Sequence, residues 1–167
     1  KKTKPQVNSG ATRAAQQPPV RTARPAQADN TSFFKRYINV LLPAAIGLIT
    51  WVFYQACLNN QLTNWDDPGY IKDNALIKDL SAEGLKNIFT TPIMGNYHPL
   101  TILSYAIEYS YVRLEPWLYH LDSLLLHILT TILVYVFVQL LTKRPVAAAV
   151  AALLFGLHPM HVESVAW

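Results

Sequence analysis

A run of 22 residues without a charged side chain, Tyr37 to Leu58, constrains this chain more than any other feature. An α-helix rises about 1.5 Å per residue, so the run is about 33 Å long as a helix and long enough to cross a lipid bilayer. Charged residues make up only 14% of the chain, against roughly 25% in soluble domains. We therefore predict an integral membrane protein.

Two further apolar segments, 117–141 and 146–158, predict two more membrane spans. Lys143 and Arg144 lie between them and are typical of a short cytoplasmic loop. Residues 59–116 carry a net charge of −3 and are less basic than the start of the chain, so we expect them on the outer side of the membrane. The segment 159–167 would begin a second outer loop.

The outer segment 59–116 contains two predicted helices. Ser81 is a candidate N-cap for a short amphipathic helix. Pro99 suits the first position of a second helix that ends near Val112 and is too short to cross a bilayer. The predicted fold class is therefore all-α: a polytopic α-helical membrane protein with about three transmembrane helices and a long outer loop that carries amphipathic interfacial helices.

Residues 1–36 carry eight Lys and Arg residues against one Asp, a net charge of +7. They lack regular apolar spacing, which predicts a disordered, basic cytoplasmic tail. The tail also lacks interleaved aromatic residues, so we predict no nucleic-acid partner. A single-span lipoprotein anchored through Cys57 is an alternative organisation. Because the chain starts at Lys1 and not at Met, we expect it to be a fragment.

Asp66 and Asp67 follow the first span directly and are the strongest candidates for chemistry. In the sequence that follows them, Pro68 and Gly69 fit the central positions of a type II turn, and proline favours an extended conformation for Asp67. The two carboxylates have two interpretations. They are turn residues, or they include a general base beside the membrane surface.

His158, His161 and Glu163 lie at the outer end of the third predicted span. Burying three titratable groups there is costly, so we expect them to line a polar cavity. Hydrogen bonding to a substrate, structural bonding at a helix end, and metal binding are all consistent with the pattern, although the spacing is not a strong zinc signature.

Polar side chains also mark the second span and the second outer helix. His120, Ser123 and His127 share one face of the second span, where interhelical hydrogen bonding is their expected role. His98 precedes Pro99, so it either helps to bind a phosphate at the helix N-terminus or only caps the helix.

Four segments occur in an order and spacing that resemble a known family. They are Trp65–Asn74, Gly95–Ser104, His120 with His127, and His158–Trp167. Together they resemble the N-terminal membrane region of bacterial tetratricopeptide-repeat membrane proteins. These proteins are similar to the transmembrane and tetratricopeptide-repeat O-mannosyltransferases of the GT-C glycosyltransferase class. The resemblance covers roughly residues 37–167.

The resemblance implies a multi-span domain that takes a sugar from a polyprenyl-phosphate donor and passes it to a protein acceptor. It implies that Asp66 is the general base and that Asp67 assists or orients it. His158, His161 and Glu163 would line the same cavity, and His98 would lie near donor or acceptor. It also implies a bacterial inner-membrane location with the acidic loop in the periplasm.

Two hypotheses about function follow from the resemblance together with the residues above. The first is a membrane glycosyltransferase that acts on a Ser or Thr hydroxyl, without a cofactor, although Asp66 with Glu163 as ligands of a divalent metal stays open. The second is a non-catalytic membrane scaffold that presents tetratricopeptide repeats located further along the protein. One departure from the family pattern is Ser123, where asparagine is common.

Overall fold

The computed structural model describes residue 3 and residues 30–166 of the chain. Most of the predicted disordered tail lies outside these residues. The first helix, α1, runs from Asn30 to Tyr54, so it begins before the predicted start of the span at residue 37. A short 3-10 helix, Gln55–Asn59, continues it. The apolar part, Tyr37–Asn59, is long enough to cross a membrane.

The second candidate span is α4, Pro116–Thr142, which matches the predicted segment closely. The third prediction needs correction, because α5, Pro145–Gly156, has only 12 residues and is about 18 Å long. The helix ends at Gly156, and the chain continues in a second helical segment, Pro159–Ala166, whose direction differs from that of α5 by 48°. The described residues therefore contain two candidate spans, or three if the bent pair forms one span.

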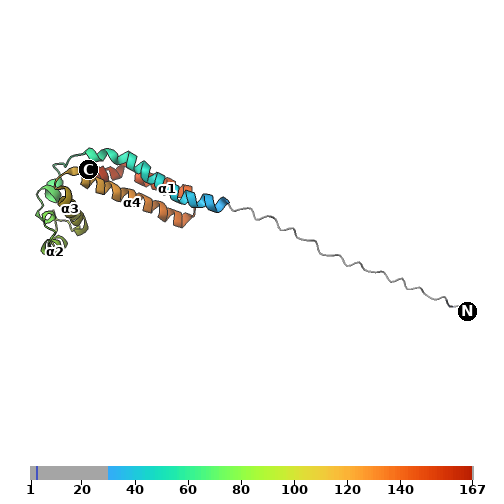
Figure 1. Ribbon diagram of the computed structural model, residues 1–167, viewed down its shortest axis with the longest axis horizontal. Helices are drawn as coiled ribbons and strands as arrows, with labels where there is room; N and C mark the ends of the chain where they lie inside the picture. Colours follow the sequence, from blue (N-terminus) through green and yellow to red (C-terminus); the bar gives the residue numbers. More distant parts are fainter. Residues whose placement is uncertain (1–2, 4–29, 167) are drawn as a thin grey trace.

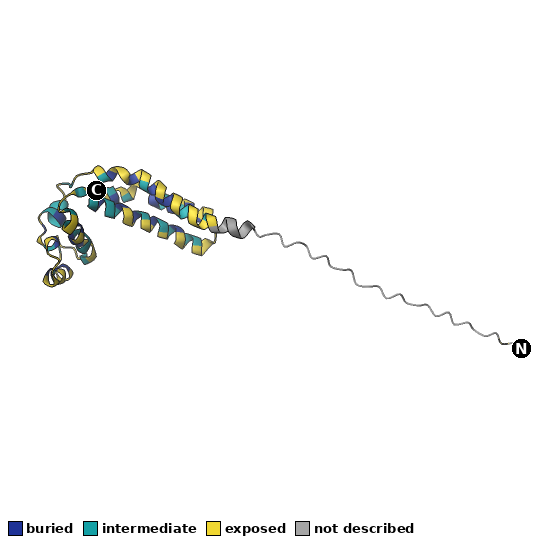
Figure 2. Cartoon of the chain, viewed as in Figure 1, coloured by how far each residue is buried: buried dark blue, intermediate teal, exposed yellow. Residues whose placement is uncertain are grey.

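The helices α1, α4 and α5 pack along one another as a bundle (Figure 1). Small and branched side chains fill the space between them, including Ala148, Ala152, Thr50 and Thr131, all of them fully buried. Close packing through small residues is typical of helices in membranes, where van der Waals contact replaces the hydrophobic effect. The outward faces are exposed and mostly apolar, as expected for contact with lipid (Figure 2).

The outer segment folds into a compact cap of short helices. It contains α2, Ala82–Thr90, and α3, Pro99–Val112, as predicted. The hydroxyl of Ser81 accepts a hydrogen bond from the Gly84 N–H at 3.1 Å, which confirms Ser81 as the N-cap of α2. Two shorter helical turns, Pro68–Lys72 and Ala75–Lys78, precede α2.

The cap is held to the bundle by a second apolar core. Its buried residues come from residues 66–78, which we call the acidic segment, and from α2, α3 and the start of α4. They are Ile71, Ile77, Ile88, Ile102, Ala106 and Tyr119. In Figure 1 the cap lies at the end of the bundle where the chain also ends, opposite the end that leads to the N-terminus. The acidic pair and the C-terminal residues thus share one end of the bundle.

Candidate functional site

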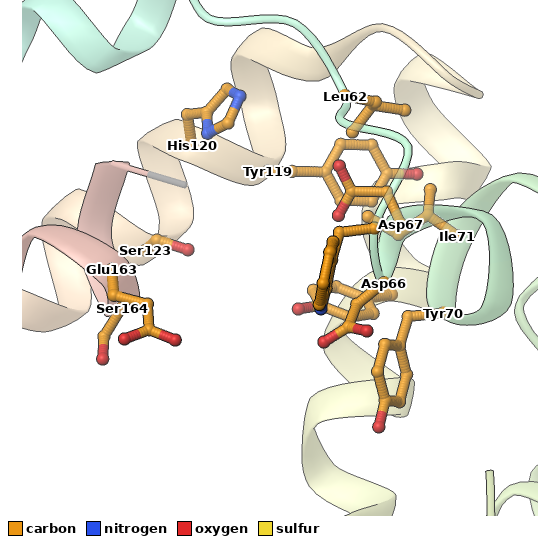
Figure 3. Close-up of a pocket in the computed structure, with 12 residues that line it drawn as sticks. Leu62, Asp66, Asp67, Tyr70, Ile71, Tyr119, His120, Ser123, Glu163 and Ser164 are labelled. Carbon is orange, nitrogen blue, oxygen red and sulfur yellow. The ribbon is translucent and has the colours of Figure 1, made fainter. Parts of the chain in front are cut away.

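A cavity of about 390 Å³ lies where the cap meets the bundle. The acidic segment, α3 and Tyr119 at the start of α4 form one wall, and His120 and Ser123 of α4 with the short C-terminal helix α6, Val162–Ala166, form the other (Figure 3). The lining residues are Leu62, Trp65, Asp66, Asp67, Tyr70, Ile71, Tyr105, Tyr119, His120, Ser123, Glu163 and Ser164. Three carboxylates and no lysine or arginine are among these described residues, so the cavity is acidic.

The two aspartates have different environments. Asp67 is half-buried, and its carboxylate accepts hydrogen bonds from the backbone N–H of Thr63 at 2.5 Å and from the Thr63 hydroxyl at 3.2 Å. Asp66 is exposed, and its carboxylate makes no hydrogen bond within the described residues. Figure 3 shows the two side chains directed to different parts of the cavity. Asp67 is therefore fixed in place, whereas Asp66 is available to a ligand.

The predicted type II turn after this pair is wrong. Residues Pro68–Lys72 form one wide helical turn, closed by the Asp73 N–H, which donates to the Pro68 carbonyl at 2.9 Å. Asp67 has helical angles, φ −57° and ψ −33°. Proline disfavours that conformation in the residue before it, and the hydrogen bonds to Thr63 stabilise it here. The helical turn directs the side chains of Tyr70 and Ile71 toward the cavity.

Gly69 is explained by a close contact and not by a left-handed turn conformation. Its φ angle is not positive. A Cβ atom added to Gly69 would meet the Sδ atom of Met94. Met94 belongs to the short loop between α2 and α3, so glycine allows that loop to approach the acidic segment.

The opposite wall brings together residues that the sequence separates widely. Glu163 and Ser164 come from α6, and His120 and Ser123 come from α4. Figure 3 shows these four side chains across an open space from Asp66 and Asp67. The expectation that Glu163 lies in one cavity with Asp66 therefore agrees with the structure. His120 and Ser123, which we expected in interhelical bonds, line the cavity.

His158 and His161 do not line this cavity, contrary to the expectation from the sequence. The Nδ1 atom of His158 accepts a hydrogen bond from the Met160 N–H at 3.2 Å and so caps the short helix Pro159–His161. The ring of His161 packs against Phe155, with centroids 4.4 Å apart. The bend after α5 explains the difference, because it directs α6 toward the cavity and keeps both histidines at the break.

His98 and His127 also lie outside the cavity. The His98 ring lies 5.1 Å from the ring of Tyr70 and borders an adjoining cavity of about 300 Å³ that shares Tyr70 and Tyr105 with the first. His127 is buried, and its Nε2 atom lies 2.9 Å from the Gly156 carbonyl, a hydrogen bond between α4 and α5. His127 thus makes the interhelical contact expected of its helix face.

A buried carboxyl next to the site was not predicted from the sequence. Glu108 on α3 is only 6% exposed. Burial, followed by the nearby charge and hydrogen bond of Asp122, raises the pKa of Glu108 to about 8. The signal in the sequence is a single charged residue in an otherwise uncharged 14-residue helix.

Tyr105, on the same helix as Glu108, lines the acidic cavity. Burial and the negative charges around it, Glu108 and Asp67 among them, raise the pKa of the Tyr105 hydroxyl to about 12. The phenol therefore keeps its proton and can donate a hydrogen bond into the cavity. Among the described residues, no group of three or more His, Cys, Asp or Glu side chains is arranged to hold a metal ion.

The fold and the cavity define a class: an all-α membrane protein that presents an acidic cavity at one end of its spans. The sequences of known proteins show which family within that class is similar to this chain. The chain is similar to the protein O-mannosyl-transferases of the TMTC group. It is 34% identical to tmtc2 of Xenopus laevis over 136 residues, 75% of this chain. It is 28% identical to TMTC3 of Homo sapiens over 131 residues, 72% of this chain.

These matches concern a small part of each relative. The chain spans 15% of the Xenopus protein and 14% of the human one. A third relative, Tmtc3 of Drosophila melanogaster, is 33% identical over 132 residues and is covered over 14% of its length. No family model matches the chain, and no solved structure matches it.

Proposed function

We propose that this chain forms part of a membrane glycosyltransferase that passes a sugar from a polyprenyl-phosphate donor to a Ser or Thr hydroxyl of a protein. The observation that supports the proposal best is the acidic cavity. It combines one exposed carboxylate, Asp66, with one fixed carboxylate, Asp67, at the end of the candidate spans. The relatives are named protein O-mannosyl-transferases, which gives the cavity a matching chemistry.

Asp66 acts as the general base in this proposal. Its carboxylate takes the proton of the acceptor hydroxyl while the hydroxyl oxygen attacks the anomeric carbon of the donor sugar. A bond forms between that oxygen and the anomeric carbon, and the bond from the anomeric carbon to the phosphate oxygen breaks. The polyprenyl phosphate leaves with the electron pair, and the configuration at the anomeric carbon inverts.

The rest of the cavity orients the reactants. Asp67 is held by Thr63 and fixes the backbone that carries Asp66. Glu163 and Ser123, on the opposite wall, offer acceptors and a donor for sugar hydroxyls. The apolar outer faces of α1 and α4 keep the cavity next to the bilayer, where a lipid-linked donor would be delivered.

The test replaces Asp66 by asparagine in the full-length protein, which is then assayed in membranes for protein glycosylation with a polyprenyl-phosphate sugar. General-base catalysis contributes about 10²- to 10⁴-fold, so we expect Asp66→Asn to lower the rate by at least about 100-fold. Asp73→Asn is the matched control, because Asp73 is exposed and does not line the cavity. A well-folded Asp66→Asn protein with the rate of the wild type would refute the proposal and favour a scaffold role. Parallel reactions with added Mg²⁺ or Mn²⁺ and with a chelator measure any need for metal.

A further inference from the structure

Glu108 is the feature of the cap that the proposed function does not use. It is the only charged residue of α3, it is 94% buried, and its Oε2 atom has no hydrogen-bond partner among the described residues. An ionised carboxylate in such a place is expensive unless it is paired with a cation or neutralised by a proton.

Within the described residues Glu108 forms no ion pair. The nearest cation along the chain is Arg113, just past the end of α3, and its guanidinium lies over the ring of Tyr109, 5.3 Å from the ring centroid. Three elements pack against α3: the 3-10 helix Ala75–Lys78, α2 and α4. The titratable groups that act on Glu108 or respond to it are Asp122 and Tyr119 on α4 and Tyr105 on α3 itself. The charged residues of the other elements that contact α3 are exposed on their outer faces; they are Lys78, Glu83 and Lys86. Asp122 is the one charged group that acts on Glu108, through its negative charge and a side-chain hydrogen bond. Two carboxyl groups form such a bond only when one of them keeps its proton.

We propose that buried Glu108 keeps its proton and donates it in a hydrogen bond to Asp122, and that this bond fastens α3 to the start of α4 and so holds Tyr105 and Tyr119, the tyrosine wall of the acidic cavity. Glu108 is then a positioning residue. The part of this inference that concerns catalysis rests on the proposed function, whereas the hydrogen bond and the helix contact do not.

The tyrosine wall connects the carboxyl pair to the cavity. Tyr105 on α3 and Tyr119 on α4 both line the cavity, and their ring centroids lie 5.9 Å apart. The Tyr119 hydroxyl donates to the carbonyl of Arg113, just past the end of α3, at 2.6 Å. Loss of the Glu108 proton would leave two negative charges facing each other in a buried place, and their repulsion would separate α3 from α4.

The contact therefore depends on pH in a defined direction. The pKa of Glu108 is raised from its ordinary value of 4.5 to about 8 in the folded protein. A carboxyl with a raised pKa contributes stability that is fully present below pH 4.5 and is lost progressively as the pH rises toward 8. Above that range the contribution is gone.

Hydrogen–deuterium exchange of the full-length protein in nanodiscs tests the contact without any assay of activity. The peptide that covers residues 99–112 is followed from pH 6 to pH 9.5, with correction for the intrinsic exchange rate. For the wild type, we expect the opening constant of α3 to rise roughly tenfold per pH unit up to about pH 8 and then to level off.

Three variants give the comparison. Glu108→Gln keeps a hydrogen-bond donor but does not titrate, so its opening constant should be independent of pH. Asp122→Asn removes the like charge and should shift the levelling-off to a lower pH. Glu83→Gln is the matched control on the exposed face of α2 and should behave as the wild type.

An unchanged slope in Glu108→Gln would overturn the inference. So would protection of residues 99–112 by added Mg²⁺ or Ca²⁺ in the wild type but not in Glu108→Gln, because a cation would then occupy the place of the proton. Loss of turnover in Asp66→Asn is a separate result, so failure of the proposed function and failure of this inference are distinguishable. If both hold, Glu108→Gln should retain turnover at pH 9, where the wild type loses it.

Discussion

Gly156 at the end of α5 gives the sharpest test of how the bundle packs. A Cβ atom added there would lie 2.7 Å from Cγ2 and 3.0 Å from Oγ1 of Thr131, and 3.2 Å from Oγ1 of Thr50. Ordinary contacts begin near 3.4 Å, so α5 must move by about 0.7 Å in Gly156→Ala. The two threonines cannot easily yield, because both are fully buried and their hydroxyls donate to carbonyls of their own helices, at 2.9 and 2.8 Å.

The expected cost follows from these contacts. Overpacking of this kind costs about 1–3 kcal/mol. The same movement displaces the Gly156 carbonyl from His127, 2.9 Å away, and interhelical hydrogen bonds in membranes contribute about 0.6 kcal/mol on average. Alanine favours a helix over glycine by about 1 kcal/mol, which offsets part of this cost. We therefore expect Gly156→Ala to lower the free energy of unfolding by about 1–2.5 kcal/mol, at least about a fivefold change in the equilibrium constant.

Gly47 on α1 provides the matched control. A Cβ atom there would lie 3.4 Å from Ile128 Cγ2 and 3.5 Å from Ile132 Cδ1, which is ordinary contact. Alanine favours a helix over glycine by about 1 kcal/mol, so Gly47→Ala should be neutral or stabilising. Reversible unfolding in mixed micelles, followed by tryptophan fluorescence, measures both variants.

Thr131→Ser removes the methyl group that Gly156→Ala would meet, so the double mutant should regain part of the lost stability. Equal effects of the two glycine substitutions, or no regain in the double mutant, would refute the packing argument.

Other predictions concern the cap. Asp67→Asn should cost about 1 kcal/mol, because hydrogen bonds from Thr63 to a neutral amide oxygen are weaker than those to a carboxylate, and faster exchange of the Thr63 amide would show it. Ser81→Ala should cost about 1 kcal/mol and deprotect the Gly84 amide, whereas unchanged exchange would contradict the cap. The Asp79 carboxylate accepts a hydrogen bond from the Ser81 N–H, which lowers the pKa of Asp79 below its ordinary value of 3.8. The stabilisation by this hydrogen bond should be present above pH 3.8 and should be lost as the pH falls further. The variant Asp79→Asn should not show this pH dependence.

The sequence predicted what depends on local pattern. Long apolar segments predicted the two candidate spans, Tyr37–Asn59 and α4. The N-cap at Ser81 predicted α2, and the proline at position 99 predicted α3. The same local rules failed at Asp67 and Pro68. There the preference of the residue before proline was overridden by hydrogen bonds from Thr63, four residues earlier.

The candidate site shows the same division. The sequence predicted the acidic pair and Glu163 as partners, and topology brought both to one end of the bundle. It did not separate Glu163, which lines the cavity, from His158 and His161, which do not. That separation depends on a 48° bend and on which face of a short helix turns inward, and a few residues of sequence pattern cannot fix an angle between helices.

The sequence by itself thus determined that the chain is helical, that it enters a membrane, and where its carboxylates lie along the chain. Only the tertiary structure decided which carboxylates are exposed to a ligand, which is held by a neighbour, and which is buried against another acid. The physical reason is that burial and pairing depend on residues far apart in the chain. Asp66, Asp67 and Glu108 all appear in the sequence as ordinary acidic residues. In the folded chain Asp66 is exposed, Asp67 is hydrogen-bonded to Thr63 and Glu108 is buried.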